Sequence, residues 1–158
     1  MSTLRNLVRF SGGPTPREEY RYKICQPRKR ERMMTARAKD HDEIVRVMQL
    51  YVDGFNDNDV GKFKEAFHDD AWIFYVDADA RLTKNLISEN FALWAAPPSW
   101  RVVGRIVSVT QVGDVASVQI VWDRNSIPSD VWIDFHNLIK IGKIWKITNK
   151  TATHSSRA

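Results

Sequence analysis

The apolar residues after residue 40 follow a helical period. They lie three or four residues apart, as on one face of an α-helix, and comprise Ile44, Val47, Met48, Tyr51, Val52 and Phe55. Asp40 and Glu43 have the spacing of a capping box at a helix start. The polar run "FNDND" then interrupts the pattern. The sequence therefore predicts an amphipathic helix that starts at residue 40 and ends near residue 55.

Two shorter segments carry a similar pattern. Val60, Phe63 and Phe67 indicate a second, shorter helix. Residues 83–94 have the pattern of a third helix, which the two prolines at 97 and 98 would end. Between these helices, "AWIFYV" has the composition of a strand and "DADAR" that of a turn.

The rest of the chain consists of long strand patterns in two hairpins. "RVVGRIVSVTQV" and "VASVQIVWDR" are joined by Gly113-Asp114, and "SDVWIDFHNLIKI" and "IWKITNKTATH" by Gly142-Lys143. A glycine in the first position of a two-residue loop is typical of a type II′ hairpin turn. Three helices followed by antiparallel strands predict an α+β fold with the helices on one face of the sheet.

The Gly142-Lys143 turn determines which residues of the last hairpin share a face. Trp145 and Ile147 fall on one face of the last strand, and Lys146 and Lys150 fall on the other. Lysine side chains are rarely fully buried. We therefore expect the face with Trp145 to point toward the helices.

Three polar residues share that predicted inner face. Asp134 and His136 belong to the first strand of the hairpin, and Asn149 would lie opposite His136 on the second. Three apolar residues are left on the outer face: Ile133, Phe135 and Ile139. Because such a face is too apolar for contact with water, we expect a homodimer that buries it.

The same alternation in the other hairpin predicts an apolar face made by Val107, Val109, Val118, Ile120 and Trp122. Arg105 would share this face, opposite Trp122. One interpretation is that its side chain reaches solvent at the strand start. The other is that it anchors an anionic group of a ligand.

The charge of the chain is concentrated at its beginning. The net charge is +5, but residues 1–40 hold 11 basic and 4 acidic side chains, which leaves 13 basic and 15 acidic for the remainder. The charge of the predicted domain, residues 41–154, therefore gives no argument for nucleic-acid binding. Only the basic extension would offer a polyanion contact. Residues 155–158 form a short tail.

The composition of residues 1–40 predicts a largely disordered extension. "MSTLRNLVRFS" resembles a short targeting helix, and "RKRER" at residues 28–32 resembles a nuclear signal. The interpretation that we favour is a start assigned too early, with Met33 or Met34 as the first residue.

The sequence lacks the residues that several classes of chemistry require. The single cysteine, Cys25, lies in the extension, so no intrachain disulfide can form and the domain has no cysteine nucleophile. This fits a reducing compartment, and we expect a cytoplasmic protein. No apolar run approaches the roughly 18 residues of a membrane helix, so we expect no membrane partner. The sequence has no glycine-rich phosphate loop, G-x-S-x-G elbow or zinc pattern, and we expect no cofactor and no metal.

The order of four motifs resembles the nuclear-transport-factor-2-like (NTF2-like) superfamily, and within it the putative lumazine-binding, SnoaL-like group. These motifs are "YVDGFNDND", "FHDDAWIF", "GDVASVQI" and "WIDFHNLIKIGKIWKITNK", within residues 42–154. The resemblance implies a cone in which three N-terminal helices pack on the concave face of a curved, mainly antiparallel sheet. It also implies a pocket between the two and, in many members, dimerisation through the outer sheet face. Some members are isomerases, dehydratases or cyclases, and many have no known activity.

Ketosteroid isomerase, one such member, resembles this chain along "YVDGFNDND" and "FHDDA". The resemblance implies that Tyr51 and Asp134 correspond to the tyrosine and the protonated aspartate that hold the enolate oxygen in that enzyme. The position of its general base is Tyr75 here, a poor base because the reference pKa of tyrosine is about 10. His136, with a reference pKa of about 6.5, is the candidate proton-transferring group. The alternative is an ion pair between Asp134 and His136.

The predicted catalytic residues are thus His136, Asp134 and Tyr51. An aromatic cavity that could stack a planar ring would include Trp100 and several members of the predicted ligand-binding set; plain core packing is the alternative. That set is Trp72, Phe74, Tyr75, Trp94, Trp122, Asn149 and Arg105. We expect a pocket for a small apolar or aromatic ligand, in which any catalysis is cofactor-free acid–base chemistry. A non-enzymatic dimerisation or protein-interaction module is the alternative.

Overall fold

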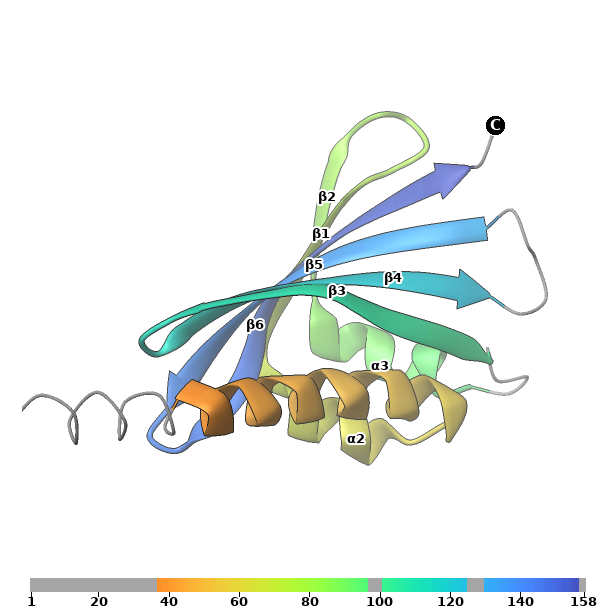
Figure 1. Ribbon diagram of the computed structural model, residues 1–158. Helices are drawn as coiled ribbons and strands as arrows, with labels where there is room; N and C mark the ends of the chain where they lie inside the picture. Colours follow the sequence, from red (N-terminus) through yellow and green to blue (C-terminus); the bar gives the residue numbers. More distant parts are fainter. Residues whose placement is uncertain (1–36, 97–100, 125–129, 157–158) are drawn as a thin grey trace, which may run out of the picture. The chain divides into compact units, whose positions relative to one another are not determined.

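A computed structural model describes residues 37–96, 101–124 and 130–156 (Figure 1). The chain divides into two compact units, residues 1–38 and 39–158. The described residues belong to the second unit, apart from residues 37 and 38 at the start of the first helix. The basic extension with "RKRER", the two prolines at 97 and 98, and Trp100 lie outside the described residues.

The first helix covers residues 37–56 and confirms the predicted amphipathic helix. Its inward face is at most 5% exposed at Ile44, Val47, Met48, Tyr51 and Val52. Asp40, however, lies within the helix, so the predicted capping box is wrong. Its carboxylate instead accepts hydrogen bonds from Lys140 Nζ at 2.5 Å and Trp145 Nε1 at 3.3 Å. These bonds fasten the helix to the last hairpin.

The second predicted helix is α2, Val60–Ala66. Asp59 caps it by accepting a hydrogen bond from the backbone N–H of Gly61 at 2.7 Å. The helix ends one residue before Phe67, the last position of its predicted pattern, and β1, Phe67–Val76, begins four residues before the predicted strand "AWIFYV".

The third predicted helix, residues 83–94, is α-helical only in its last four residues. Residues Leu82–Leu86 form strand β2, followed by the 3₁₀ turn η1, Ile87–Asn90, and the single helical turn α3, Phe91–Trp94. Strand β2 pairs antiparallel with β1, from Trp72 opposite Leu86 to Val76 opposite Leu82. This pairing overrides the local helical pattern, as tertiary context often does.

The described residues form a sheet of six strands in the order β2-β1-β6-β5-β4-β3. The later strands are β3, Val102–Val112; β4, Val115–Arg124; β5, Asp130–Ile141; and β6, Ile144–Ser156. Only β1 and β6 run parallel; the other neighbours are antiparallel. The sheet curves over the helices, which cover one of its faces (Figure 1). Among the described residues, no helix has the length and apolar character required to cross a membrane.

Both predicted hairpin turns are present. Val112 pairs with Val115 across Gly113-Asp114, and Ile141 pairs with Ile144 across Gly142-Lys143. Each turn glycine has a positive φ, 58° and 66°, which side-chain-bearing residues rarely adopt. A positive φ at the first loop position agrees with the predicted turn type.

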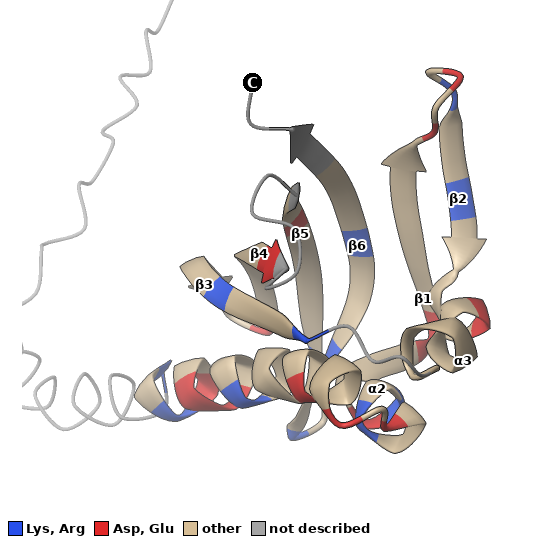
Figure 2. Ribbon diagram, turned by 90° about the vertical axis from the view of Figure 1, so that its right-hand side faces the viewer, with Lys and Arg blue, Asp and Glu red and all other residues tan. Residues whose placement is uncertain are grey.

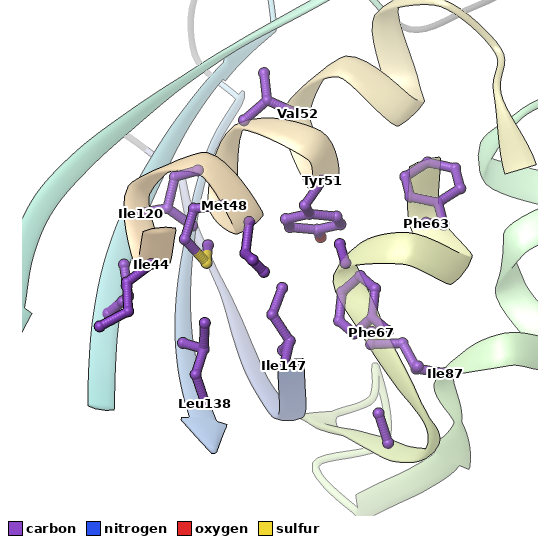
Figure 3. Packing of buried hydrophobic residues seen from close by; sticks show 14 of the residues in the cluster. Ile44, Met48, Tyr51, Val52, Phe63, Phe67, Ile87, Ile120, Leu138 and Ile147 are labelled. Atoms are coloured by element: carbon purple, nitrogen blue, oxygen red, sulfur yellow. The ribbon is translucent and has the colours of Figure 1, made fainter. Parts of the chain in front are cut away.

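The core lies between the first helix and the concave face of the sheet. Figure 3 shows side chains of the helix, among them Ile44, Met48 and Tyr51, extending toward Leu138 and Ile147 of the strands. The helix approaches β3 so closely that a Cβ at Gly104 would stand 2.6 Å from Val52 Cγ2. Glycine at this position therefore permits the packing.

A β-bulge in β6 changes the faces that simple alternation predicts. Near the turn, Leu138 pairs with Ile147 as expected, but the next pair is Asn137 with Asn149. Thr148 is therefore an extra residue on β6. Every residue of β6 beyond Thr148 is shifted by one position relative to β5.

Because of this shift, two polar residues lie on the opposite face of the sheet from the one predicted. Lys150, which the alternation placed outside, lies opposite His136 and is only 7% exposed. Asn149, which was expected inside with His136, lies opposite the exposed Asn137 and accepts a hydrogen bond from its Nδ2 at 3.4 Å. The expected inner position of Asn149 is thus wrong. Asp134 and His136 point inward as predicted, 1% and 0% exposed.

A second bulge lies in β3. Ile106 pairs with Ile120 and Ser108 with Gln119, so Val107 is extra and is 57% exposed. Arg105 consequently lies opposite Val121 instead of the predicted Trp122. Before the bulge, the residues on either side of Arg105 therefore point inward, and Arg105 itself points outward.

Candidate functional site

A cavity of about 340 Å³ lies on the helix-covered side of the sheet. Its wall is mostly apolar or aromatic and takes residues from the first helix, from η1 and α3, and from five strands. The lining residues are Phe55, Ile73, Tyr75, Asn90, Leu93, Trp94, Val102, Trp122, Trp132, Asp134, Lys150 and Ala152. Asp134 and Lys150 are the charged members of this wall.

The two charged residues belong to a buried polar group that we call the Asp134 cluster: Tyr51, Trp122, Asp134 and Lys150. Lys150 Nζ lies 2.9 Å from Asp134 Oδ2, and the two side chains are 9% and 2% exposed. Trp122 Nε1 donates to the same oxygen at 2.7 Å, and the Tyr51 hydroxyl donates to it at 3.4 Å. Lys150 Nζ also donates to the Tyr51 hydroxyl at 2.6 Å.

These contacts explain how two charges remain inside an apolar fold. A buried charge is very costly unless it is paired and hydrogen-bonded. Here the pair has no net charge, and three donors converge on one carboxylate oxygen. Lys150 Nζ also stands 5.3 Å from the ring centre of Tyr51 and 5.1 Å from that of Trp94, which are cation–π distances. Figure 2 shows Lys and Arg in blue and Asp and Glu in red on both the helices and the strands, β2, β3, β4 and β6 among them.

One oxygen of the cluster is left without a partner. Asp134 Oδ1 is buried and accepts no hydrogen bond from any residue that the structure describes. All of the donors reach Oδ2. The carboxylate therefore retains accepting capacity at a buried atom.

Tyr51 acts as a neutral hydroxyl in this arrangement. Its complete burial raises the pKa of its phenol well above the ordinary value, and the neighbouring negative charge of Asp134 raises it further. Tyr51 therefore keeps its proton at neutral pH. It connects the first helix to the charged pair on the sheet.

His136 lies in the core next to the cluster and does not line the cavity. The centre of its ring lies 5.1 Å from the ring centre of Tyr51 and 6.4 Å from that of Phe67. Neither of its ring nitrogens has a hydrogen-bond partner among the described residues. The pKa of His136 is lowered to about 3, mainly because the ring is buried. The negative charge of Asp134 raises this pKa, and the positive charge of Lys150 lowers it. His136 is thus neutral near pH 7. The ion pair considered between Asp134 and His136 is absent, because Asp134 pairs with Lys150.

Three residues of the predicted ligand-binding set line the cavity: Tyr75, Trp94 and Trp122. Trp72 and Phe74 do not, because β1 alternates and directs Ala71 and Ile73 inward, where they are at most 8% exposed. Lys84 Nζ instead lies over the ring of Trp72, 4.8 Å from its centre.

Asn149 and Arg105 also lie away from the cavity, each because of a β-bulge. The bulge at Thr148 turns Asn149 outward, as described above. The bulge at Val107 leaves the Arg105 side chain 70% exposed, in an ion pair with Asp123 at 3.2 Å. Of the two interpretations of Arg105, the structure supports the one in which the side chain reaches solvent.

Lys150 is the main residue that the sequence reasoning missed. Its position after the bulge is invisible to a simple alternation, and the rarity of buried lysine argued against it. A weak signal was Ala152, which alternation would have placed on the outer face with Lys150 although alanine is often buried. Within residues 37–96, 101–124 and 130–156 no group of histidine, cysteine, aspartate or glutamate could hold a metal ion.

Comparisons with known proteins agree with this architecture. The family model described as putative lumazine-binding matches residues 39–152, so the chain belongs to this family. None of the curated proteins compared matches it.

Solved structures establish the NTF2-like fold. An NTF2-like protein of unknown function from Shewanella baltica is 29% identical, with a TM-score of 0.67 over 76% of this chain and 97% of the other. One from Methylobacillus flagellatus is 25% identical, with a TM-score of 0.63 over 75% and 94%. An NTF2-like protein from Streptomyces avermitilis, described as a putative dehydratase, is 12% identical, with a TM-score of 0.58 over 76% and 99%. At that identity the last likeness shows the fold alone.

The charged pair generates a prediction about stability. Replacement of Lys150 by methionine leaves the Asp134 carboxylate buried without its counter-charge, and we expect a loss of about 3–5 kcal/mol in the free energy of unfolding. Urea unfolding at pH 7 measures this loss. The double variant Lys150→Met/Asp134→Asn should recover part of it, whereas Lys143→Met, at an exposed turn position, should have little effect. A Lys150→Met protein as stable as the wild type would contradict the buried ion pair.

His136 generates a prediction about pH. The unfolded chain binds a proton at this histidine near pH 6.5, whereas the folded chain does so only near pH 3, so stability falls as the pH drops through this window. For this residue alone the loss between pH 8 and pH 5 is about 2 kcal/mol. We expect His136→Leu to become more stable relative to the wild type by that amount over the same interval, measured by urea unfolding at each pH. Parallel pH profiles for the two proteins would refute a neutral, buried His136.

Proposed function

We propose that this member of the putative lumazine-binding family binds a small apolar or aromatic molecule in the cavity beside the Asp134 cluster. The observation that carries the proposal is a largely apolar cavity with one buried, charge-balanced polar group in its wall. Small-molecule sites combine apolar linings with a few placed polar groups in this way. A volume of about 340 Å³ suits a ligand of one or two fused rings.

The lining favours a flat, uncharged ligand. Tyr75, Trp94 and Trp122 offer aromatic surfaces for a planar ring. Because Lys150 and Asp134 already balance each other, a ligand with a net charge would bring an uncompensated charge into an apolar space. A neutral ligand brings no such charge.

Any chemistry in this cavity is expected to be acid–base chemistry without a cofactor. Asp134 and Lys150 are the titratable groups nearest to a bound molecule, since His136 does not line the cavity. Tyr75 would contact the ligand through its ring and would not act as a base at neutral pH. An isomerase or lyase reaction is compatible with these groups. The cytoplasmic location expected from the sequence remains a prediction.

A pair of substitutions on β6 tests the binding proposal. Ala152 lines the cavity, and its neighbour Thr151 is exposed on the opposite face of the same strand. We expect Ala152→Leu to fill the cavity and to abolish the thermal shift given by aromatic ligands of the wild type in a screen of neutral bicyclic compounds. Thr151→Leu should keep the full response.

Two results would contradict the proposal. One is a wild-type protein whose melting temperature no compound in the screen raises. The other is an Ala152→Leu protein that responds like the wild type, since the ligand would then bind elsewhere.

The convex face of the sheet favours a second proposal, a homodimer. Phe135 is 50% and Ile139 42% exposed, and Ile133 beside them is partly buried, on the face away from the helices. Exposed apolar side chains on one face of a sheet are typical of protein interfaces. A second copy of the chain would cover them symmetrically. In this alternative the fold serves as a dimerisation or interaction module.

Solution mass measurements test the homodimer. We expect the wild type to elute as a dimer in size-exclusion chromatography with light scattering, and Phe135→Lys to elute as a monomer because a charge would be buried at the interface. Leu82→Lys is the matched control, since Leu82 is 74% exposed on the edge strand β2, distant from β5 in the sheet order. A monomeric wild type, or a dimer unaffected by Phe135→Lys, would exclude this interface.

A further inference from the structure

We propose that Lys150 captures carbonyl compounds in the cavity as a covalent imine, so that aldehydes or ketones form the ligand class. This inference rests on the proposed binding function, because the carbonyl compound must first enter the cavity. It goes further in assigning Lys150 a bond-forming role. A lysine amine and a carbonyl carbon react to form such an imine at many enzyme sites.

The surroundings of Lys150 differ from those of a surface lysine. Its side chain is 9% exposed, yet Lys150 lines the cavity, so the amine is largely shielded from solvent by the protein and still borders the space that a ligand would occupy. Imines hydrolyse in water, and an apolar wall protects them. Exposed lysines such as Lys143 have no such protection.

Asp134 can accept the proton that the amine must lose. An ammonium group cannot attack a carbonyl carbon, because its nitrogen has no free electron pair. Asp134 Oδ2 lies 2.9 Å from Lys150 Nζ, within range for direct proton transfer. After the transfer the pair consists of a neutral amine and a neutral carboxylic acid. The net charge of the cavity wall remains zero.

The reaction is then balanced without any further group. The free amine of Lys150 forms a C–N bond to the carbonyl carbon, and a proton moves from nitrogen to oxygen to give a carbinolamine. The protonated Asp134 returns its proton to the carbinolamine hydroxyl, the C–O bond breaks and water leaves. The products are a protonated imine on Lys150, the Asp134 carboxylate and one water molecule. Their charges match those of the initial ion pair.

The cluster suits both the intermediate and the product. The carbinolamine hydroxyl is a donor, and the carboxyl group beside it has an oxygen, Oδ1, with no donor among the described residues. The protonated imine is a cation in the place of the ammonium, so it keeps the charge contact with Asp134. The rings of Tyr51 and Trp94, about 5 Å from Nζ, stabilise either cation.

Reductive trapping tests the inference on the wild-type protein. The folded full-length chain is incubated near pH 7 with 2-naphthaldehyde and cyanoborohydride, which converts the imine to a stable secondary amine. Peptide mass mapping then gives the rate of labelling at each lysine. We expect Lys150 to react at least about tenfold faster than every other lysine, because the cavity holds the aldehyde beside the amine. The corresponding alcohol, 2-naphthylmethanol, should protect Lys150 by competing for the cavity.

Lys84 is the internal control. Its Nζ also lies beside an aromatic ring, that of Trp72, but Lys84 does not line the cavity. Fast labelling at Lys84 as well would attribute the reaction to aromatic surface, and even labelling of all lysines would attribute it to bulk chemistry; either result overturns the inference. Lys84→Arg should leave labelling at Lys150 unchanged. Lys150→Arg keeps the positive charge and should lose the fast label without gain at another lysine.

The test separates this inference from the binding proposal. The alcohol cannot form an imine, so a rise in melting temperature with 2-naphthylmethanol reports binding alone. If the alcohol stabilises the wild type and Lys150 stays unlabelled, covalent capture is wrong and the binding proposal stands. If neither the alcohol nor the aldehyde raises the melting temperature and Lys150 stays unlabelled, both proposals are wrong for this ligand class.

Discussion

The ion pair between Lys150 and Asp134 is the contact on which the candidate site depends. A carboxylate that is 1% exposed in an apolar interior must be paired or must lose its charge. The partner reaches Asp134 only because β6 contains one extra residue at Thr148, which turns Lys150 inward. Trp122 and Tyr51 then complete the hydrogen bonds of Oδ2 from β4 and the first helix. Oδ2 of Asp134 thus contacts β6, β4 and the first helix, and its contact with β6 depends on the bulge at Thr148.

The regular parts of the fold could be predicted because their signals are local. The helical period after residue 40 and the two glycine turns fix the first helix and both hairpins, and the turn register places Asp134 and His136 inside. A β-bulge has no such signal, since any residue type can be the extra one. Alternation therefore fails beyond Thr148 and Val107, which explains the errors at Asn149, Lys150 and Arg105.

The remaining errors concern strand β1 and its neighbour. An apolar segment such as "AWIFYV" shows that a strand is present, but it does not show which of its faces is buried, because both carry large apolar side chains. The register with β6 relates the two faces: Ile73 lies opposite the buried Lys150, and Trp72 lies opposite Asn149. The same pairing makes residues Leu82–Leu86 a strand where the local pattern favoured a helix. The face of β1 depends on β6, which lies far away in the sequence, whereas β2 depends on its pairing with the preceding strand.

The position of His136 shows how the interior is divided. Packed between Tyr51 and Phe67 and neutral near pH 7, it behaves as part of the core below the cluster. The Asp134 cluster thus forms the boundary between a filled core and a cavity. The core side needs no charge, and the cavity side has the ion pair of Asp134 and Lys150 in its wall. A molecule that enters meets an amine and a carboxylate 2.9 Å apart, surrounded by aromatic rings, and these groups decide what it can bind and which bonds it can form.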